Sequence, residues 1–255
     1  MEHIKTEFDD GLLVVTMARG KANPLNRAMV EEMNTAVEEA GRNEGVRGVV
    51  LASAFAKVFS GGFDVKEVFE YDREAMTEFF GRFIDLYEGL MLLPKPVVAA
   101  VNGHAFAGGA VLALAADKRV MAEGDFGFAL NEVNIGLVLP PAFIRMAVNA
   151  IGVSNARELA LEGKTFTPAM ALETGLASEL AGPEQVLERA IRQARDLAEK
   201  PPRTFGAIKS TFVEVTGLIP PGGGRKDLGQ FVDHWFSPES REHRQRLIES
   251  LRKKV

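Results

Sequence analysis

The chain has 255 residues, of which 46% are hydrophobic and 25% charged, so it can bury a sizeable core and is not disordered over most of its length. The formal net charge of −5 argues against nucleic-acid binding, because neutralising phosphates requires a concentrated lysine and arginine surface. Cysteine is absent, which excludes disulfides, iron–sulfur clusters and thiolate catalysis. The first residues lack a secretory signal pattern and no apolar run reaches the ~18 residues of a membrane span, so we expect a soluble, intracellular protein of the cytoplasm with no membrane partner.

The first half of the chain alternates short β-rich runs with helical patterns. Valine-rich runs at 12–18, 48–53 and 96–103 are bounded by glycine, proline or charge, which is typical of strands buried on both faces. Between them, the apolar residues of 26–43 and 66–93 recur at helical spacing. Strands separated by helices imply crossover connections, so we predict an α/β fold with a mainly parallel sheet.

From about residue 140 the pattern becomes a succession of helices punctuated by proline and glycine. We therefore expect an α/β core over residues 1–195 and a C-terminal helical region over 196–255. The aromatic run FVDHWF at 231–236 has helical spacing, which is more typical of core or of a subunit contact than of a ligand cage.

Two glycine pairs, each between a strand and a helix, indicate chemistry. In VFSGGFDVKEV, Gly61 and Gly62 would let the backbone N–H of Phe63 point into an open site. In AVNGHAFAGGAVLALAAD, Gly108 and Gly109 begin a helix whose first N–H groups have no partner within the helix. Two such donors aimed at one point would bind a carbonyl oxygen and stabilise it more strongly as it becomes an oxyanion.

The order and spacing of these motifs resemble the crotonase family, the enoyl-CoA hydratase/isomerase superfamily, over nearly the whole chain. The matching pieces are KANPLN, FSGGFDV, AVNGHAFAGG and FGFALNEVNIGLVLP. The resemblance implies a crotonase-like (ββα)n spiral core, C-terminal helices that cover an active site, and assembly as a homotrimer or a dimer of trimers. It also implies an acyl-CoA thioester substrate, with CoA carried by the substrate and no further cofactor.

By the same resemblance, the N–H groups of Phe63 and Gly108 form the oxyanion hole for the thioester carbonyl. The resemblance also assigns the residues that line the path of the pantetheine and adenine, namely Ser60, Gly61, Gly62, Asp64, Lys21, Ala22 and Asn23. Asp64 is expected to cap the following helix and not to act as a base, since an aspartate there satisfies free N–H groups of the first turn.

Residue 111 lies three positions after Gly108 on the same helix face, so its side chain is expected beside the thioester. Hydratases of the family carry a catalytic glutamate at this position and a second one further on, because adding water calls for one group to orient the water and another to handle a proton. Here the residue is Val111. An apolar wall cannot hold a nucleophilic water, so hydration is disfavoured.

The family's second carboxylate is matched by Glu132 in ALNEVNIGL. This combination is similar to the monofunctional enoyl-CoA delta isomerases, the dodecenoyl-CoA isomerases among them, which implies that Glu132 moves a proton from C2 to C4 of a 3-enoyl-CoA in fatty-acid β-oxidation. We expect an apolar pocket containing Val111, Phe128 and Leu130 to raise the pKa of Glu132. Asn131 either hydrogen-bonds the carboxylate or the ligand, or is a loop-capping amide.

Other residues offer weaker candidates. His104 is expected to pack or hydrogen-bond, and the remaining histidines show no metal-ligand spacing, so no metal is expected. A serine hydrolase is disfavoured because no GxSxG elbow occurs. Two alternatives stay open: an enoyl-CoA hydratase or other acyl-CoA enzyme of the same fold, and a non-catalytic acyl-CoA-binding protein that uses the two amides only as a grip.

Overall fold

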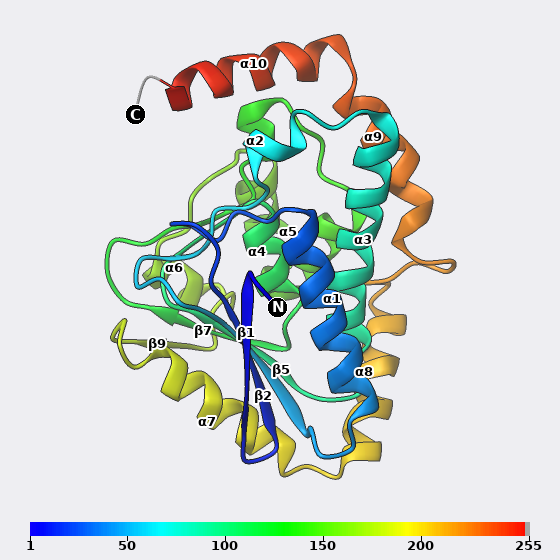
Figure 1. Cartoon of the computed structure of the whole chain (residues 1–255). Helices are drawn as coiled ribbons and strands as arrows, with labels where there is room; N and C mark the ends of the chain where they lie inside the picture. The colour runs from blue at the N-terminus through cyan, green and yellow to red at the C-terminus, as the bar shows by residue number, and fades with distance from the viewer. Residues whose placement is uncertain (253–255) are drawn as a thin grey trace.

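The computed structural model describes residues 1–252, without the side chains of residues 247, 248 and 250–252. The framework of the fold is a six-stranded sheet (Figure 1). The strand order is β1-β2-β3-β5-β7-β9, with β1 antiparallel to β2 and every other neighbouring pair parallel. The mainly parallel α/β sheet expected from the sequence is therefore confirmed. The strands are β1 (Ile4–Asp9), β2 (Leu12–Met17), β3 (Gly48–Ser53), β5 (Val97–Val101), β7 (Lys118–Ala122) and β9 (Glu179–Ala181).

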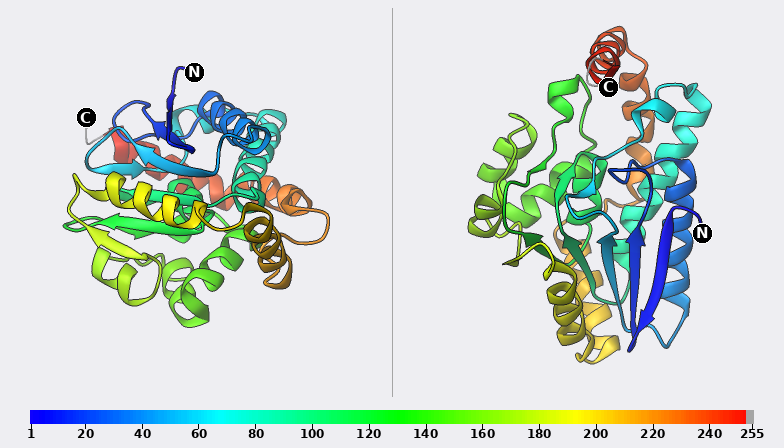
Figure 2. Two further views of the ribbon diagram at one scale, coloured as in Figure 1. Left: turned by 90° about the horizontal axis from the view of Figure 1, so that it is seen from below. Right: turned by 60° about the vertical axis from the view of Figure 1, so that its left-hand side comes forward.

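Both faces of this sheet are covered, because alternate side chains of its strands point to opposite sides. On one face, Val50 and Val98 pack against α7 (Val186–Ala198), whose alanines recur every four residues and let the helix approach closely. On the other face, Val49 and Leu51 join the main core. Helices α1 (Arg27–Arg42) and α3 (Arg73–Leu92) contribute to this core and lie side by side next to the sheet in Figure 1, and Figure 2 gives two further views.

The helix expected over 66–93 is two helices, α2 (Val65–Val68) and α3. The chain breaks between them because the Asp72 side chain accepts a hydrogen bond from the N–H of Ala75 (2.8 Å) and so caps α3. Asp64 caps α2 in the same way, as predicted.

A second, small sheet contains three short parallel strands in the order β4-β6-β8 (Val58–Ser60, His104–Phe106 and Phe128–Ala129). Each follows a strand of the large sheet and leads toward a helix, which repeats a ββα unit along the chain. The predicted (ββα)n spiral core is thereby confirmed. Gly103 allows β6 to meet the start of β4, since a Cβ at this position would lie 2.1 Å from the carbonyl carbon of Lys57.

The later part of the chain is helical and wraps the core, and its last helix crosses the top of the molecule in Figure 1. The predicted boundary between residues 195 and 196 falls inside α7, which packs on the large sheet. Within residues 1–252, none of the helices combines the length and apolar character that crossing a membrane requires. The remaining elements are α4 (Gly108–Leu114), η1 (Glu132–Ile135), α5 (Pro141–Ala160), α6 (Pro168–Glu173), α8 (Pro202–Val215), η2 (Gly224–Asp227), α9 (Leu228–Trp235) and α10 (Pro238–Arg252).

Candidate active site

The candidate site lies where the three strands of the small sheet end. Phe63, Gly108 and Glu132 each follow one of these strands by no more than three residues. Because the strands are parallel, their carboxyl ends meet at one edge of the sheet, which is where α/β proteins commonly bind ligands. All three residues line one cavity of about 390 Å³. The tertiary structure thus brings together the three residues that the sequence predicts to be catalytic.

The loops that carry Phe63 and Gly108 touch each other because glycine occupies position 62. Gly62 has a φ of +90°, and a Cβ there would lie 2.9 Å from Cβ of Ala107 and 3.3 Å from the backbone nitrogen of Gly108. Across residues 1–252, neither the N–H of Phe63 nor that of Gly108 donates a hydrogen bond to another protein group. Both donors are therefore free to bind an oxygen atom in the cavity.

Ala107, at the entrance of α4, has a strained backbone. Its φ of 48° and ψ of −124° are rare for a residue with a side chain, and such a conformation costs roughly 1–3 kcal/mol. Two hydrogen bonds hold it, from Ala107 N to Ala129 O and from Val111 N to Ala107 O, each 3.0 Å. The strained turn brings Gly108, the first residue of α4, to the cavity.

Glu132 is the first residue of η1 and is only 7% exposed. Its Oε2 is buried and accepts no hydrogen bond from the described residues. Burial raises the pKa of this carboxyl to about 7, against the opposing effect of a hydrogen bond from its own backbone N–H. A carboxyl with such a pKa can accept and release a proton near neutral pH.

The rest of the cavity wall is predominantly apolar and aromatic. Phe80 of α3 stacks on Phe231 of α9 with ring centroids 3.7 Å apart, and Trp235 and Phe143 complete this side. Phe231 and Trp235 belong to the run predicted as core or subunit contact; they are buried within the chain, and their role as cavity wall was missed. Their four-residue spacing, which places both on one helix face, was the available signal.

A family model described as enoyl-CoA hydratase/isomerase matches residues 7–251 of the chain. The chain belongs to the enoyl-CoA hydratase/isomerase family. It is thus a crotonase-superfamily enzyme, as the resemblance implied.

Individual relatives within this family carry different reaction names. The chain is 30% identical to the probable enoyl-CoA hydratase EchA17 of Mycobacterium tuberculosis, over 83% of this chain and 80% of that protein. It is 32% identical to the mitochondrial enoyl-CoA delta isomerase 1 of Mus musculus, over 73% of this chain and 65% of that protein. The crystal structure of human mitochondrial delta3-delta2-enoyl-CoA isomerase has the same fold, with a TM-score of 0.94, 24% identity and 99% coverage of both chains. Sequence identity therefore places the chain in the family and leaves its reaction open.

Three further residues assigned by the resemblance also line the cavity: Gly61, Ala22 and Asn131. The N–H of Gly61 donates to the carbonyl oxygen of Ala22 (2.9 Å), which joins the two loops at the rim. The Asn131 side chain makes no capping hydrogen bond with η1, and its Oδ1 is buried without a partner among the described residues. Its predicted loop-capping alternative is therefore wrong, and an unused acceptor remains beside Glu132.

Other residues predicted along the path of CoA support the loops and do not line the cavity. The Ser60 hydroxyl donates to the carbonyl oxygen of Asn23 (2.8 Å) and accepts from the N–H of Gly62 (3.2 Å). Ser60 and Asn23 are both fully buried. Their polar groups are thus used in building the loop that carries Phe63.

Asp64 and Lys21 also lie outside the cavity lining. The Asp64 carboxylate accepts from the N–H of Lys66 (3.1 Å) and forms an ion pair with Arg19 (2.8 Å). Lys21 is exposed on the loop that leads to the site.

The prediction that Val111 stands beside the thioester needs correction. Val111, Phe128 and Leu130 are all fully buried in the main core, and none of them lines the cavity. After its first residue, Gly108, the short helix α4 turns its side chains into that core, and the cavity that Glu132 lines is walled by other residues, Val138 and Phe143 among them. The chemical consequence of Val111 is unchanged, because α4 supplies no carboxylate to the cavity.

His104 has the hydrogen-bonding role predicted for it. Its Nδ1 accepts from the N–H of Gly127 (3.0 Å), and its ring stacks on Phe106.

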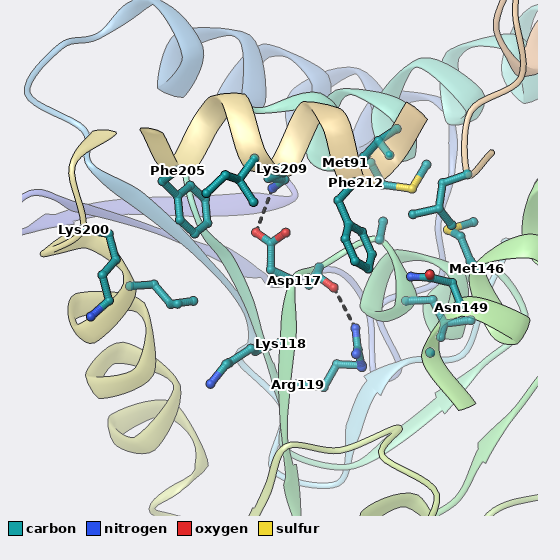
Figure 3. Close-up of a pocket in the computed structure, with 18 of the residues that line it drawn as sticks. Met91, Asp117, Lys118, Arg119, Met146, Asn149, Lys200, Phe205, Lys209 and Phe212 are labelled. Atoms are coloured by element: carbon teal, nitrogen blue, oxygen red, sulfur yellow. Dashed lines mark hydrogen bonds and ion pairs between the residues drawn. The ribbon is translucent and has the colours of Figure 1, made fainter. Parts of the chain in front are cut away.

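A larger cavity of about 600 Å³ lies at the opposite end of α4 and is shown in Figure 3. The buried Lys209 in its wall is paired, with Nζ 2.7 Å from Asp117 Oδ2, and Nη1 of Arg119 donates to the carbonyl oxygen of Ala116 (2.7 Å). Because these charged groups already have partners within the protein, the smaller cavity, in which one carboxylate oxygen of Glu132 has no partner among the described residues, is the better candidate for catalysis.

Proposed function

We propose that the chain is an enoyl-CoA delta isomerase that converts 3-enoyl-CoA to trans-2-enoyl-CoA, with CoA as part of the substrate. The observation that carries this proposal is that Glu132 is the single ionisable side chain among the described residues that line the cavity. Moving a double bond requires one group that takes a proton and gives it back, whereas hydration requires a second group to orient water. The similarity to the mouse isomerase supports the same reaction.

In the proposed reaction, the thioester oxygen accepts hydrogen bonds from the N–H groups of Phe63 and Gly108. The ionised Glu132 removes a proton from C2, which the thioester and the C3–C4 double bond both acidify. The resulting dienolate places its negative charge on the oxygen between the two amides, where one such donor typically lowers the barrier by about 3–4 kcal/mol. The protonated Glu132 then delivers the proton to C4, which leaves the double bond between C2 and C3.

The lining of the cavity suggests where each half of this substrate would lie. We infer that the acyl chain lies against the aromatic wall and that the pantetheine leaves past Ala22 and Gly61, toward the exposed Lys21. Burial keeps the carboxyl of Glu132 near a pKa of about 7, so both of its protonation states are available at neutral pH.

We also propose assembly as a homotrimer or a dimer of trimers, mediated by the region after residue 195. Helix α8 supports this, because Ile208, Phe212 and Val215 are exposed by 64%, 55% and 80%, and apolar surface of this kind is typical of interaction sites. Light scattering of the purified protein should give the mass of three or six chains. A monomer at micromolar concentration would contradict the proposal.

The isomerase proposal is tested with a nonconjugated 3-enoyl-CoA, which develops the ultraviolet absorbance of a conjugated thioester as it is converted. The wild type should produce this signal, and Glu132→Gln should lose it while still binding a saturated acyl-CoA. Glu123→Gln, which removes an exposed carboxylate that does not line the cavity, is the matched control and should retain turnover.

Other outcomes point to the alternatives. Formation of 3-hydroxyacyl-CoA from a 2-enoyl-CoA faster than isomerisation would favour a hydratase. Binding of acyl-CoA without conversion at any chain length would favour a non-catalytic binding protein. Wild-type turnover in Glu132→Gln would rule out Glu132 as the base.

A further inference from the structure

The turn that carries Glu132 determines where its carboxylate can point. The turn consists of η1 and Gly136, which has a φ of 66°, and it closes through a hydrogen bond from Leu137 N to Glu132 O (3.0 Å). Oε2 of Glu132 has no partner among the described residues. Because other side chains do not anchor the carboxylate, its position depends on the backbone of this turn.

Two histidines from the C-terminal helices hold the turn at Gly136. The Nε2 atom of His234, in α9, lies 3.1 Å from the carbonyl oxygen of Gly136, and since a carbonyl only accepts, Nε2 carries the proton. The ring of His243, in α10, fills the space beside Gly136, where a Cβ would lie 2.6 Å from its Cδ2. On the other side of the turn, Nδ2 of Asn134 donates to the carbonyl oxygen of Gly163 (3.3 Å).

The segment that carries His234 is itself fixed to the core. Trp235, the next residue, is 2% exposed and lines the cavity. Its carbonyl oxygen accepts from Nη2 of Arg244 (2.7 Å), and the Arg244 guanidinium lies 4.5 Å from the centre of the Trp235 ring and 5.4 Å from that of Phe69. A hydrogen bond from His234 can therefore hold the turn in place, because the residue that follows His234 is buried and anchored to Arg244.

We propose that His234 is a positioning residue for Glu132, acting through the carbonyl group of Gly136. This inference rests on the proposed function, in which Glu132 is the base. His234 does not line the cavity, so it acts on the base and not on the substrate. The C-terminal helices then do more than cover the site, since they fix the orientation of the carboxylate that moves the proton.

The test compares the wild type with His234→Phe, which keeps a ring without the donor, and His234→Gln, whose amide nitrogen can replace Nε2. Asp233→Asn is the matched control, because Asp233 is the neighbour of His234 on α9 and, among the described residues, its side chain forms only an exposed ion pair with Arg73. We expect His234→Phe to lower kcat by about fivefold to tenfold, the effect of one lost hydrogen bond, with KM changed by less than about twofold. His234→Gln should recover most of kcat, and Asp233→Asn should behave as the wild type.

Hydrogen exchange gives a readout that does not depend on activity. Amides of the peptide spanning residues 132–137 should exchange faster in His234→Phe than in the wild type, and at the wild-type rate in His234→Gln. Unchanged kcat and unchanged exchange in His234→Phe would overturn the role of His234, and so would a kcat that glutamine does not restore. If those results are found while Glu132→Gln is inactive, the role of His234 is wrong and the proposed function stands. If Glu132→Gln keeps its turnover, both the role of Glu132 as the base and the role of His234 are wrong.

Discussion

Replacing Glu132 by glutamine should change the free energy of unfolding in a way that depends on pH. Burial raises the pKa of the carboxyl from 4.5 to about 7 in the folded chain, partly offset by its own backbone N–H. The folded state therefore binds this proton more tightly than the unfolded state. The stability that the protonated carboxyl contributes is present below about pH 4.5 and is lost as the pH rises toward 7.

The magnitude follows from the same values. One pKa unit corresponds to 1.36 kcal/mol, so the ionised carboxylate lowers the unfolding free energy by about 3 kcal/mol above pH 7. Glutamine does not titrate. The unfolding free energy of Glu132→Gln minus that of the wild type should thus increase by about 3 kcal/mol between pH 4 and pH 8, whatever constant difference the amide itself introduces.

Urea unfolding at several pH values measures this difference. The chain has a single tryptophan, the buried Trp235, so its fluorescence reports unfolding of the cavity wall, and all samples must have one protein concentration because assembly adds to the apparent stability. Glu123→Gln, which makes the same chemical change at an exposed carboxylate, is measured beside it as the matched substitution. A difference for Glu132→Gln that stays constant within about 1 kcal/mol from pH 4 to pH 8 would refute the conclusion that the carboxyl is desolvated.

Three further predictions concern the same site. The value of kcat/KM should rise with pH through about 7 as Glu132 ionises, and a flat profile from pH 5 to pH 8 would contradict its role as base. Gly109→Ala should strongly destabilise the protein, because the added Cβ would lie 2.4 Å from a backbone oxygen of β4. Gly229→Ala in α9 adds a Cβ in open space and should stabilise the protein by up to about 1 kcal/mol. Equal melting temperatures of the two variants would exclude the predicted clash. Phe231→Ala should lower the free energy of unfolding by about 3–5 kcal/mol. It should also shift the dependence of kcat/KM on acyl length toward longer acyl chains, because it removes one ring of the Phe80–Phe231 stack in the cavity wall. An unchanged dependence would show that α9 does not limit the length of the acyl chain.

Two features of the site, its two glycine pairs, could be recognised in the sequence because each pair consists of adjacent residues. In the glycine pairs at 61–62 and 108–109, Gly62 and Gly109 occupy positions where a Cβ would lie within 3 Å of neighbouring atoms, and the pairs themselves are visible in the sequence. Glu132 could be assigned only through the family resemblance, since a glutamate between asparagine and valine has no local signature of burial.

Other features depended on contacts between distant segments. The strands of the small sheet contain two or three residues, too few to show a periodicity of two, so the edge where the site forms was not predicted. The direction of Val111 was wrong because helical spacing gives the face of a helix but not the neighbour that this face meets. The aromatic wall at 231–235 reaches the cavity only after α9 packs on α3.

The sequence by itself determined the α/β alternation, the strands buried on both faces, and the two amides that can hold an oxyanion, because local hydrophobic period and glycine backbone freedom specify them. Only the tertiary structure decided that those amides and Glu132 share one cavity, that Glu132 is buried enough to titrate near neutrality, and that His234 holds its turn. Desolvation and long-range hydrogen bonds arise from packing between segments far apart in the sequence, as in the hydrogen bond between His234 and Gly136, which spans 98 positions, and no local pattern encodes them.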